Sequence, residues 1–479
     1  MKTKTKMKLT WVPGQLVAAT LMAIIIQSAN VLATDWPTYR ADYSRSGVSP
    51  DPLIMPLRQS WVFKSHQKPQ PAWQGEAKWD GYNKVYNMKA RQIFDRAFHT
   101  VNVGDHVYWA SSADDKIYCY NAADGQEVWV YYTDGPVRLA PTIVDGKLYA
   151  GSDDGFAYCL NAETGELEWR TQVAPDLQIV PGNGRMVSKW PVRTSIAVLD
   201  GLAYCSAGMF PAEGVYLTAL KADDGSRQWQ TPQFDLPAQG YLLASESRLY
   251  VPAGRNNPVV FNRATGTRIR VVSGQGGTYC LLTDNMLVFG PGKTGTLGMV
   301  EEGTSDQLAS FSGNHMIVTP AMSYLHSDTD ITALDRTRYL ALAADRKKTA
   351  QLQSQAYKEL KKLEEDAQAN AATIELIKKD LVNFGKDIDR LSAEMNKCQP
   401  WKVDSKYPAS LILAGDFLVA GGENGFAAYS TTDGAKAFEA AVDGTVYGMS
   451  AGNGRLFIST DKGHIYTFES ASLFGKVEK

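Results

Sequence analysis

Short runs of alternating apolar and polar residues fill the chain from Val101 to Arg170, and they recur at a fixed interval. The first copy reads VNVGDHVYWASSADDKIYCYNAADGQEVW, and the second reads PTIVDGKLYAGSDDGFAYCLNAETGELEW. Trp169, at the end of the second copy, follows Trp129 by 40 residues. Alternation with a period of two predicts strands, and the Gly and Asp residues between the runs predict tight turns. A period of about 40 residues with four strands per copy predicts the blades of a β-propeller.

The pattern continues along the chain and predicts an all-β, eight-bladed β-propeller. Blades one to six are expected within residues 34–343, and the end of blade six with blades seven and eight within residues 398–470. Residues 471–479 are expected to form a tail. Blade eight has only three strands of its own, so we expect the strand near residues 57–63 to complete it and remove an open edge.

Residues 344–397 break this pattern and predict helix. They are rich in Ala, Lys, Glu, Leu and Gln and contain no Pro. Their apolar residues recur at spacings of four and three, which is the seam of a coiled coil. The clearest seam consists of Ile377, Leu381, Phe384, Ile388, Leu391 and Met395. A weaker region before it predicts a reversal, so we expect an antiparallel helical hairpin inserted into blade six. The hairpin either stands in solvent or presents an apolar face to a partner.

The N-terminus has the features of a secretory signal peptide, predicted at residues 1–33. Four lysines precede an apolar stretch at residues 16–26, and small residues precede a cleavage site after Ala33. The alternative is an uncleaved anchor, but the apolar stretch is short for a membrane span. We therefore expect export to the periplasm or the extracellular space. After cleavage no transmembrane span is expected.

Charge and cysteine content exclude further classes. A formal net charge of -2 gives no support for a nucleic-acid partner. The chain has five cysteines, an odd number, and Cys119 and Cys159 occupy matching places in two blades. We interpret the cysteines as small buried residues rather than as a disulfide framework.

The blades resemble the pyrroloquinoline-quinone (PQQ) repeat. The matching stretches are YNAADGQEVW, LNAETGELEW and LKADDGSRQW, with weaker matches at FNRATGTRIR and YSTTDGAKAF. The opening DWPTYRADYSRSG, residues 35–47, is similar to the N-terminal signature of secreted proteins of this class. The resemblance implies that the Trp of the motif docks one blade on the next. The residues expected in this structural role are Trp61, Trp129, Trp169, Trp229, Trp401 and Phe438.

Two branches of this superfamily give different expectations. Quinoprotein alcohol dehydrogenases hold PQQ and calcium in the central channel, beside an adjacent Cys pair and an acidic set. No Cys-Cys occurs here, and the acidic set has no matching positions. Assembly factors of the BamB type are non-catalytic periplasmic scaffolds with a lipid-attachment Cys, which this chain lacks. We therefore expect no cofactor, with PQQ and calcium as the alternative.

Two arginines are the main candidates for a ligand site. When blades two and three are aligned by their turns, Arg138 and Arg193 fall at the same position, just before the first strand and beside the central channel. Their guanidinium groups are suited to carboxylates or phosphates. The alternative is that they pair with neighbouring acids or structure a turn. Arg185, Lys189 and Trp190 belong to a long connecting loop, residues 174–190, and are expected to extend the site.

Other polar motifs have simpler explanations. His99 and His315 have no second His at metal spacing, so no zinc site is expected. The acids in SADDK and GSDDG, which begin at Ser111 and Gly151, are interpreted as turn residues. GPGKTGT, around Lys293, lacks the spacing of a phosphate-binding loop. No catalytic set is recognised.

The sequence thus favours a non-catalytic binding or assembly scaffold with protein partners. It would use the propeller face and the helical hairpin. One alternative is a PQQ-dependent oxidoreductase with a divergent site. The other is a carbohydrate-binding propeller that uses Trp73, Trp79 and Trp190, which would have to be exposed on one face.

Overall fold

The computed structural model describes residues 35–471 apart from short gaps, at 74–78, 80–83, 85, 87, 89–91, 255, 275, 278, 284–285, 292–295, 302–306 and 367–369. All described residues belong to one compact unit, Ala33–Lys479. The predicted signal peptide, the tail after residue 471 and most of the GPGKTGT motif lie outside the described residues.

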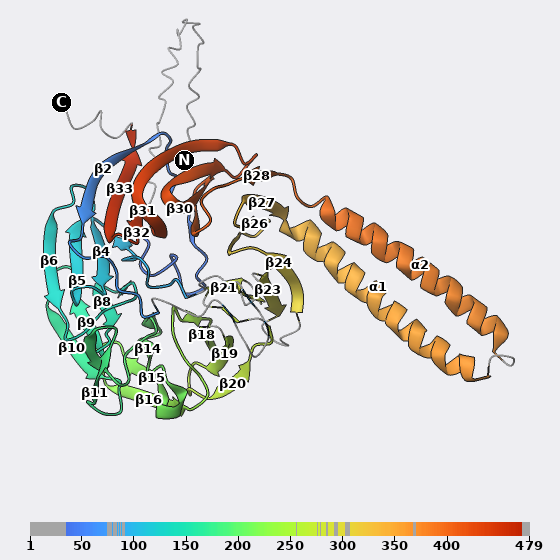
Figure 1. The fold of residues 1–479 in the computed structure, drawn as a ribbon, viewed down its shortest axis with the longest axis horizontal. Coiled ribbons are helices and arrows are strands. Elements are labelled where there is room, and N and C mark those ends of the chain that lie inside the picture. The colour runs from blue at the N-terminus through green and yellow to red at the C-terminus, as the bar shows by residue number, and fades with distance from the viewer. Residues whose placement is uncertain are drawn as a thin grey trace, which may run out of the picture. The chain divides into compact units, whose positions relative to one another are not determined.

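The repeats fold into antiparallel four-stranded sheets that follow one another in chain order around a common centre (Figure 1). The first three are β3 (Val101–Val103), β4 (His106–Ser111), β5 (Lys116–Asn121) and β6 (Glu127–Tyr132); β7 (Thr142–Val144), β8 (Lys147–Gly151), β9 (Phe156–Asn161) and β10 (Leu167–Gln172); and β13 (Ala197–Leu199), β14 (Leu202–Ala207), β15 (Val215–Lys221) and β16 (Arg227–Gln233).

Three more sheets of the same kind follow. They are β17 (Leu243–Ala244), β18 (Arg248–Ala253), β19 (Asn256–Asn262) and β20 (Arg268–Val271); β21 (Tyr279–Thr283), β22 (Met286–Gly290), β23 (Thr296–Glu301) and β24 (Gln307–Ser312); and β25 (His315–Val318), β26 (Met322–His326), β27 (Asp330–Asp335) and β28 (Lys402–Asp404). The described part of the chain is therefore mainly β-structure.

The remaining strands form a sheet of seven, in the order β1-β29-β30-β31-β32-β33-β2. Their bounds are β1 (Val48–Ser49), β2 (Leu57–Lys64), β29 (Ser410–Ala414), β30 (Phe417–Ser430), β31 (Lys436–Gly452), β32 (Arg455–Thr460) and β33 (His464–Ser470). β2 pairs antiparallel with β33, so an N-terminal strand ends a sheet made from C-terminal strands. The two long strands change register within their length, at Glu423/Gly425 in β30 and at Val446/Gly448 in β31.

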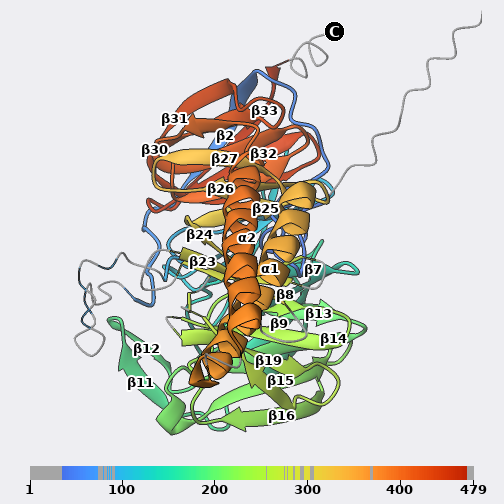
Figure 2. The same ribbon diagram turned by 90° about the vertical axis from the view of Figure 1, so that its right-hand side faces the viewer.

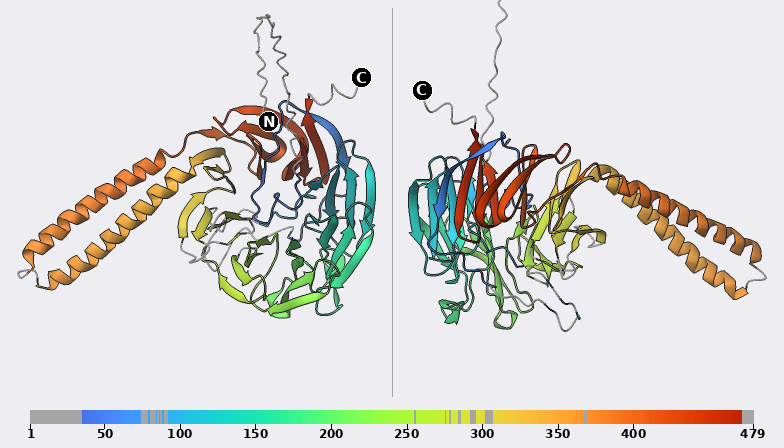
Figure 3. Two further views of the ribbon diagram at one scale, coloured as in Figure 1. Left: turned by 180° about the vertical axis from the view of Figure 1, so that it is seen from behind. Right: turned by 45° about the horizontal axis from the view of Figure 1, so that its top comes forward.

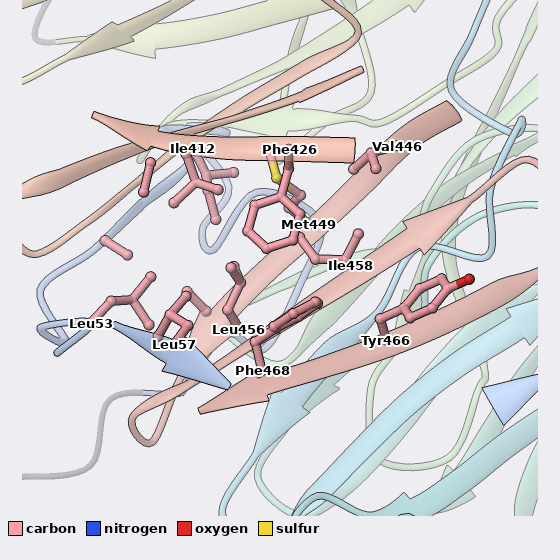
Figure 4. Close-up of a cluster of buried hydrophobic side chains, with 14 of the residues drawn as sticks. Leu53, Leu57, Ile412, Phe426, Val446, Met449, Leu456, Ile458, Tyr466 and Phe468 are labelled. Carbon is pink, nitrogen blue, oxygen red and sulfur yellow. The ribbon is translucent and has the colours of Figure 1, made fainter. Parts of the chain in front are cut away.

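The two halves of this sheet bury a common apolar cluster (Figure 4). Phe426 from β30 and Phe468 from β33 meet edge to face, with ring centroids 4.9 Å apart. Ile412 from β29 and Leu456 from β32 belong to the same cluster. Because these strands are separated within the sheet, the sheet must bend between them to bring the side chains together.

Tight turns joining the first two strands of a sheet follow from paired Asp and Gly residues. Asp145 and Gly146 have φ values of 50° and 72°, and Asp200 and Gly201 have 49° and 72°. A two-residue turn with positive φ at both positions matches the twist of a hairpin, and Asp-Gly is among the sequences that tolerate it best. These turns fix the register of the strand pairs.

Neighbouring sheets are joined by indole rings that lie on glycine turns. The Trp129 Nε1 donates to Ala162 O at 3.0 Å. A Cβ on Gly165 in that turn would lie 2.6 Å from the Trp129 ring. The same contact joins Trp61 to Gly125, Trp129 to Gly165, Trp169 to Gly225, Trp229 to Gly266 and Trp401 to Gly434. Phe438 packs against Phe426 and Phe468, with ring centroids 6.0 and 6.5 Å away.

Residues 35–51, which we call the hub segment, run through the space that the sheets surround (Figure 3). Ile143 N donates to Pro37 O, and Leu282 N donates to Ser44 O, both at 2.8 Å. Val198 N donates to the hydroxyl of Tyr43 at 3.2 Å. In this way the segment is hydrogen bonded to the first strands of five four-stranded sheets, β3, β7, β13, β17 and β21, and to β29 of the seven-stranded sheet.

Two buried arginines hold the hub segment in place. The side chain of Arg45 is 1% exposed and donates to Leu242 O from Nε at 2.9 Å and from Nη2 at 2.7 Å. Arg40 Nη1 donates to Leu411 O at 2.8 Å, and its Nε donates to Arg45 O at 3.0 Å. The arginines therefore connect the segment to sheets on different sides of the centre.

Two long helices separate β27 from β28. α1 spans Arg336–Leu363, continues as a 3₁₀ turn (Glu364–Asp366), and is followed by α2, Ala371–Asn396. The helices lie side by side (Figure 2), and Arg346 Nε donates to Ser392 Oγ at 2.9 Å. Among the described residues, neither these nor any other helix is long and apolar enough to cross a membrane.

α1 begins before the predicted start at residue 344. Asp335 accepts a hydrogen bond from Arg338 N and caps the first turn. Tyr339 and Leu340 then pack beside the buried Cys398. The expected onset was too late because these apolar residues lie next to a strand and do not continue the heptad seam.

The connecting segment 174–190 is also more regular than predicted. It contains the antiparallel strands β11 (Ile179–Gly182) and β12 (Arg185–Ser188). Between them Asn183 and Gly184 have φ values of 52° and 73°. Asn-Gly is a strong hairpin signal, which was overlooked because Pro181 and Gly182 precede it. The five cysteines are buried and free, as predicted.

Gly165→Ala and Gly146→Ala form a matched pair that measures the docking of an indole on a turn. Both glycines have positive φ, 75° and 72°, but a Cβ on Gly146 meets nothing within 4 Å. Gly146→Ala should cost about 1 kcal/mol of backbone strain. Gly165→Ala should cost about 2 kcal/mol more, because the methyl group displaces Trp129. Urea unfolding measures both, and equal losses would contradict the docking role.

Candidate functional site

The two predicted arginines come together on one aspartate. Arg138 Nε donates to Asp153 Oδ2 at 2.7 Å. Arg193 donates to both oxygens of Asp153, from Nε at 2.6 Å and from Nη2 at 3.0 Å. A second acid, Asp95, lies 3.9 Å from Arg138 Nη1. The contacts match the alternative in which the arginines pair with neighbouring acids. A direct role in ligand binding stays a prediction.

This arginine–aspartate network joins segments that are distant in sequence. Asp153 lies in the turn between β8 and β9 and is fully buried, while Arg193 precedes β13 in the next sheet. Arg138 also donates to Gln70 O, and Asp95 accepts from Ala72 N at 2.7 Å. Burial raises the pKa of Asp95, and Arg138 partly opposes that rise. The network therefore fastens the segment before residue 73 to two neighbouring sheets.

The other three predicted residues have separate partners. Lys189 forms an ion pair with Glu213 at 2.5 Å, and Arg185 forms one with Asp115. Trp190 Nε1 donates to Glu213 O at 2.8 Å, and the side chain is 7% exposed. A ring buried to this degree presents no face to a sugar. Trp190 therefore does not support the carbohydrate-binding hypothesis. Trp79, another residue of that hypothesis, is 60% exposed.

A cavity of about 180 Å³ lies beside the hub segment. Tyr39, Arg40 and Arg45 of the hub segment line it, together with Tyr241 and Tyr279 from the surrounding sheets. The ring of Tyr39 stacks on that of Tyr241 with centroids 3.5 Å apart. The guanidinium of Arg40 lies 5.2 Å from the centre of the Tyr279 ring. The cavity thus combines aromatic walls with two buried positive charges.

The titratable groups of this cavity respond to burial and to Arg40. Burial raises the pKa of Tyr39 and of Tyr279, and the charge of Arg40 opposes the rise in both. Burial lowers the pKa of His315, and the nearby His326 and Arg40 lower it further. The positive charge of Arg40 therefore acts on three groups of the lining.

Three histidines near the cavity, His99, His315 and His326, are buried. His315 and His326 face each other across β25 and β26, with their Nδ1 atoms 3.4 Å apart. Burial lowers the pKa of His326 and that of His99, each to about 4, so both stay neutral at pH 7. In the described ranges, no three His, Cys, Asp or Glu side chains converge as metal ligands.

Two comparisons relate this architecture to known proteins. A family model described as "Outer membrane protein assembly factor BamB", built on the PQQ repeat, matches residues 67–337, more than half of the chain. The chain belongs to this family. No curated protein matches it in sequence.

Solved structures share the fold of this PQQ-repeat propeller at low sequence identity. BamB from Moraxella catarrhalis has 12% identity and a TM-score of 0.53, covering 86% of this chain and 100% of that one. A quinohemoprotein alcohol dehydrogenase from Comamonas testosteroni has 13% identity and a TM-score of 0.59, covering 91% and 80%. A europium-containing methanol dehydrogenase has 11% identity and a TM-score of 0.56, covering 91% and 98%.

The cavity of this family member has the wrong donor set for a quinone held by a hard cation. Such a cation needs several convergent oxygen ligands. The described lining offers one carboxylate, that of Asp328, against the guanidiniums of Arg40 and Arg45. The residues present do not fit a calcium–quinone centre, and no redox step follows from them.

Sequence reasoning missed the residues at the centre of both arrangements. Asp153 was interpreted only as a turn residue, and Arg40 and Arg45 only as part of an opening signature. A signal was present, because residues 35–47 contain two arginines among three aromatic residues. Nothing in the local pattern, however, indicates that this segment lies at the centre of the sheets.

Asp153→Asn and Asp115→Asn compare the buried network with a half-buried ion pair. Asp153→Asn leaves the buried Arg193 without its charged partner and Arg138 with Asp95 alone, and it should cost about 3–5 kcal/mol of unfolding free energy. Asp115→Asn removes the more exposed partner of Arg185 and should cost less than about 1 kcal/mol. Urea unfolding followed by tryptophan fluorescence measures both. Losses of similar size would show that the network contributes no special stability.

Proposed function

We propose that this chain is an exported, non-catalytic scaffold that binds or assembles partner proteins. The propeller face and the helix pair would provide its contact surfaces. The assembly-factor family supports this proposal. Export rests on the predicted signal peptide and the predicted periplasmic or extracellular location.

The architecture within this proposal is an eight-bladed propeller. Six four-stranded sheets account for six blades. The seven-stranded sheet would contribute two more, one centred on β29 and β30 and the other on β32, β33 and β2, with the long β31 shared between them. α1 and α2 would be an antiparallel coiled-coil hairpin inserted between the third and fourth strands of the sixth blade.

The main support for the proposal is that residues at the centre of the structure form hydrogen bonds and ion pairs that connect the sheets. The hub segment occupies the centre and is hydrogen bonded to strands of six sheets. The buried charges of Arg138, Arg193 and Asp153 are engaged with one another. Because these groups hold the sheets together, partner proteins would bind at the outer surfaces.

The helix pair supplies a second surface of suitable chemistry. α2 buries Ile374, Ile377, Leu381 and Leu391. Leu376 and Val382, however, are 59% and 58% exposed, and Tyr357 on α1 is 57% exposed. These exposed side chains would give a partner protein apolar contacts along the helix pair.

A shortened helix pair tests the scaffold function. Arg346 and Ser392 are hydrogen bonded, so a short glycine-rich loop can connect residues 347 and 391 and replace 348–390. This variant keeps Tyr339, Leu340 and Leu391, so its melting temperature should stay within a few degrees. Cross-linking in the native host followed by mass spectrometry should recover a partner with the full chain and lose it with the shortened variant.

An unchanged set of partners would show that the helix pair is not a contact surface. A double substitution, Leu376→Glu with Val382→Glu, provides a control without deletion and should lose the same partner. The oxidoreductase alternative predicts a different result, namely saturable calorimetric binding of PQQ with calcium at about one molecule per chain. That outcome would contradict the non-catalytic function.

A further inference from the structure

The buried arginines of this protein have two different kinds of hydrogen-bond partner. Arg138 and Arg193 each contact the carboxylate of Asp153. Arg40 and Arg45 are as deeply buried, at 6% and 1% exposure, yet their hydrogen bonds go to carbonyl and hydroxyl oxygens. Among the residues that the structure describes, no carboxylate oxygen lies within 4.0 Å of either guanidinium.

A buried charge without a counter-charge is costly. Neutral acceptors satisfy the hydrogen-bonding groups of a guanidinium but do not neutralise it. Arg40 and Arg45 both line the same cavity. The cavity beside them is therefore a region of positive potential.

Arg40 also retains donors. Its Nε, Nη1 and Nη2 donate to Arg45 O, Leu411 O and Ser46 O. A guanidinium has five N–H groups, so one proton on each terminal nitrogen has no acceptor within the described part of the chain. Since Arg40 lines the cavity, those protons are suited to a carboxylate placed there.

The remaining lining determines the rest of the ligand. The rings of Tyr39, Phe94, Tyr241 and Tyr279 border the cavity. An engineered apolar cavity of about 150 Å³ accommodates a benzene molecule. A cavity of about 180 Å³ therefore has room for one aromatic ring with a carboxylate.

The cavity also has an exposed side through which a ligand can enter. Asp328 is exposed and belongs to the lining, and Asn314 Nδ2 donates to its Oδ1 at 2.9 Å. Its negative charge lies at the solvent-facing rim, where water and salt screen it. The buried arginines at the other side are screened less, so the net preference is for an anion.

We propose that this cavity is a binding site for a small aromatic carboxylate with a single ring. The carboxylate lies against Arg40, and the ring packs among Tyr39, Phe94 and Tyr279. Binding needs neither calcium nor a quinone and is independent of the scaffold function. The bound anion supplies the counter-charge that Arg40 and Arg45 lack.

Calorimetric titration of the full mature chain with four probes tests this inference. Benzoate should bind saturably at about one per chain. Benzamide, which keeps the ring without the charge, should bind at least tenfold more weakly. Acetate, which keeps the charge without the ring, should also bind at least tenfold more weakly, and benzylamine, with the opposite charge, should not bind.

Substitutions of residues that line the cavity test whether benzoate binds there. Arg40→Gln should weaken benzoate at least tenfold and leave benzamide unchanged. Because Arg40 also anchors the hub segment, a second variant, Ala409→Leu, fills the cavity without removing those hydrogen bonds. It should weaken benzoate at least tenfold, whereas Ala435→Leu at an exposed position should leave binding unchanged.

Three results would overturn the inference. The first is no benzoate binding to the wild-type chain at 10 mM, about the weakest level that calorimetry measures. The second is equal affinity for benzoate and benzamide, which would identify an apolar cavity without anion preference. The third is benzoate binding that Ala409→Leu leaves unchanged, which would place the ligand elsewhere.

Discussion

The hydrogen bonds of the hub segment are the constraint on which the arrangement of the sheets depends. A four-stranded sheet in a ring has a first strand whose outer edge is not paired within the sheet. The carbonyl groups of Pro37, Tyr43 and Ser44 accept hydrogen bonds from three such strands, and that of Gly47 accepts one from β29 of the seven-stranded sheet. One short segment thus satisfies edges that belong to different sheets and links their positions to one another.

Contacts between neighbouring sheets supplement this central link. Indole rings rest on glycine turns, and the Asp153 network joins two sheets through buried ion pairs. The two kinds of contact have different physical origins. The indole contact requires a glycine without a side chain in the turn, whereas the Asp153 network pairs opposite charges. Arg40 and Arg45 belong to neither kind of contact. They anchor the hub segment through neutral acceptors and leave a positive centre beside an aromatic cavity.

The local pattern of the sequence predicts the strands, the turns and the tryptophan contacts well, because these depend on residues close in the chain. The alignment of turns places Arg138 and Arg193 at matching positions, and both contact Asp153. It did not identify that partner, because a turn aspartate looks the same in sequence whether it is buried or exposed. The central position of the hub segment is a long-range property, so no periodicity in residues 35–51 indicates it.

The most direct test of this account is hydrogen exchange at the amides that donate to the hub segment. Native-state exchange, followed by mass spectrometry, should be measured on peptides that contain Ile143, Ala244, Leu282 and Leu413. If the hub segment holds the sheets as one unit, all four amides should exchange with the free energy of global unfolding. Much faster exchange at any of them, with the remainder still protected, would show that the sheets hold together without the hub segment and would contradict the account.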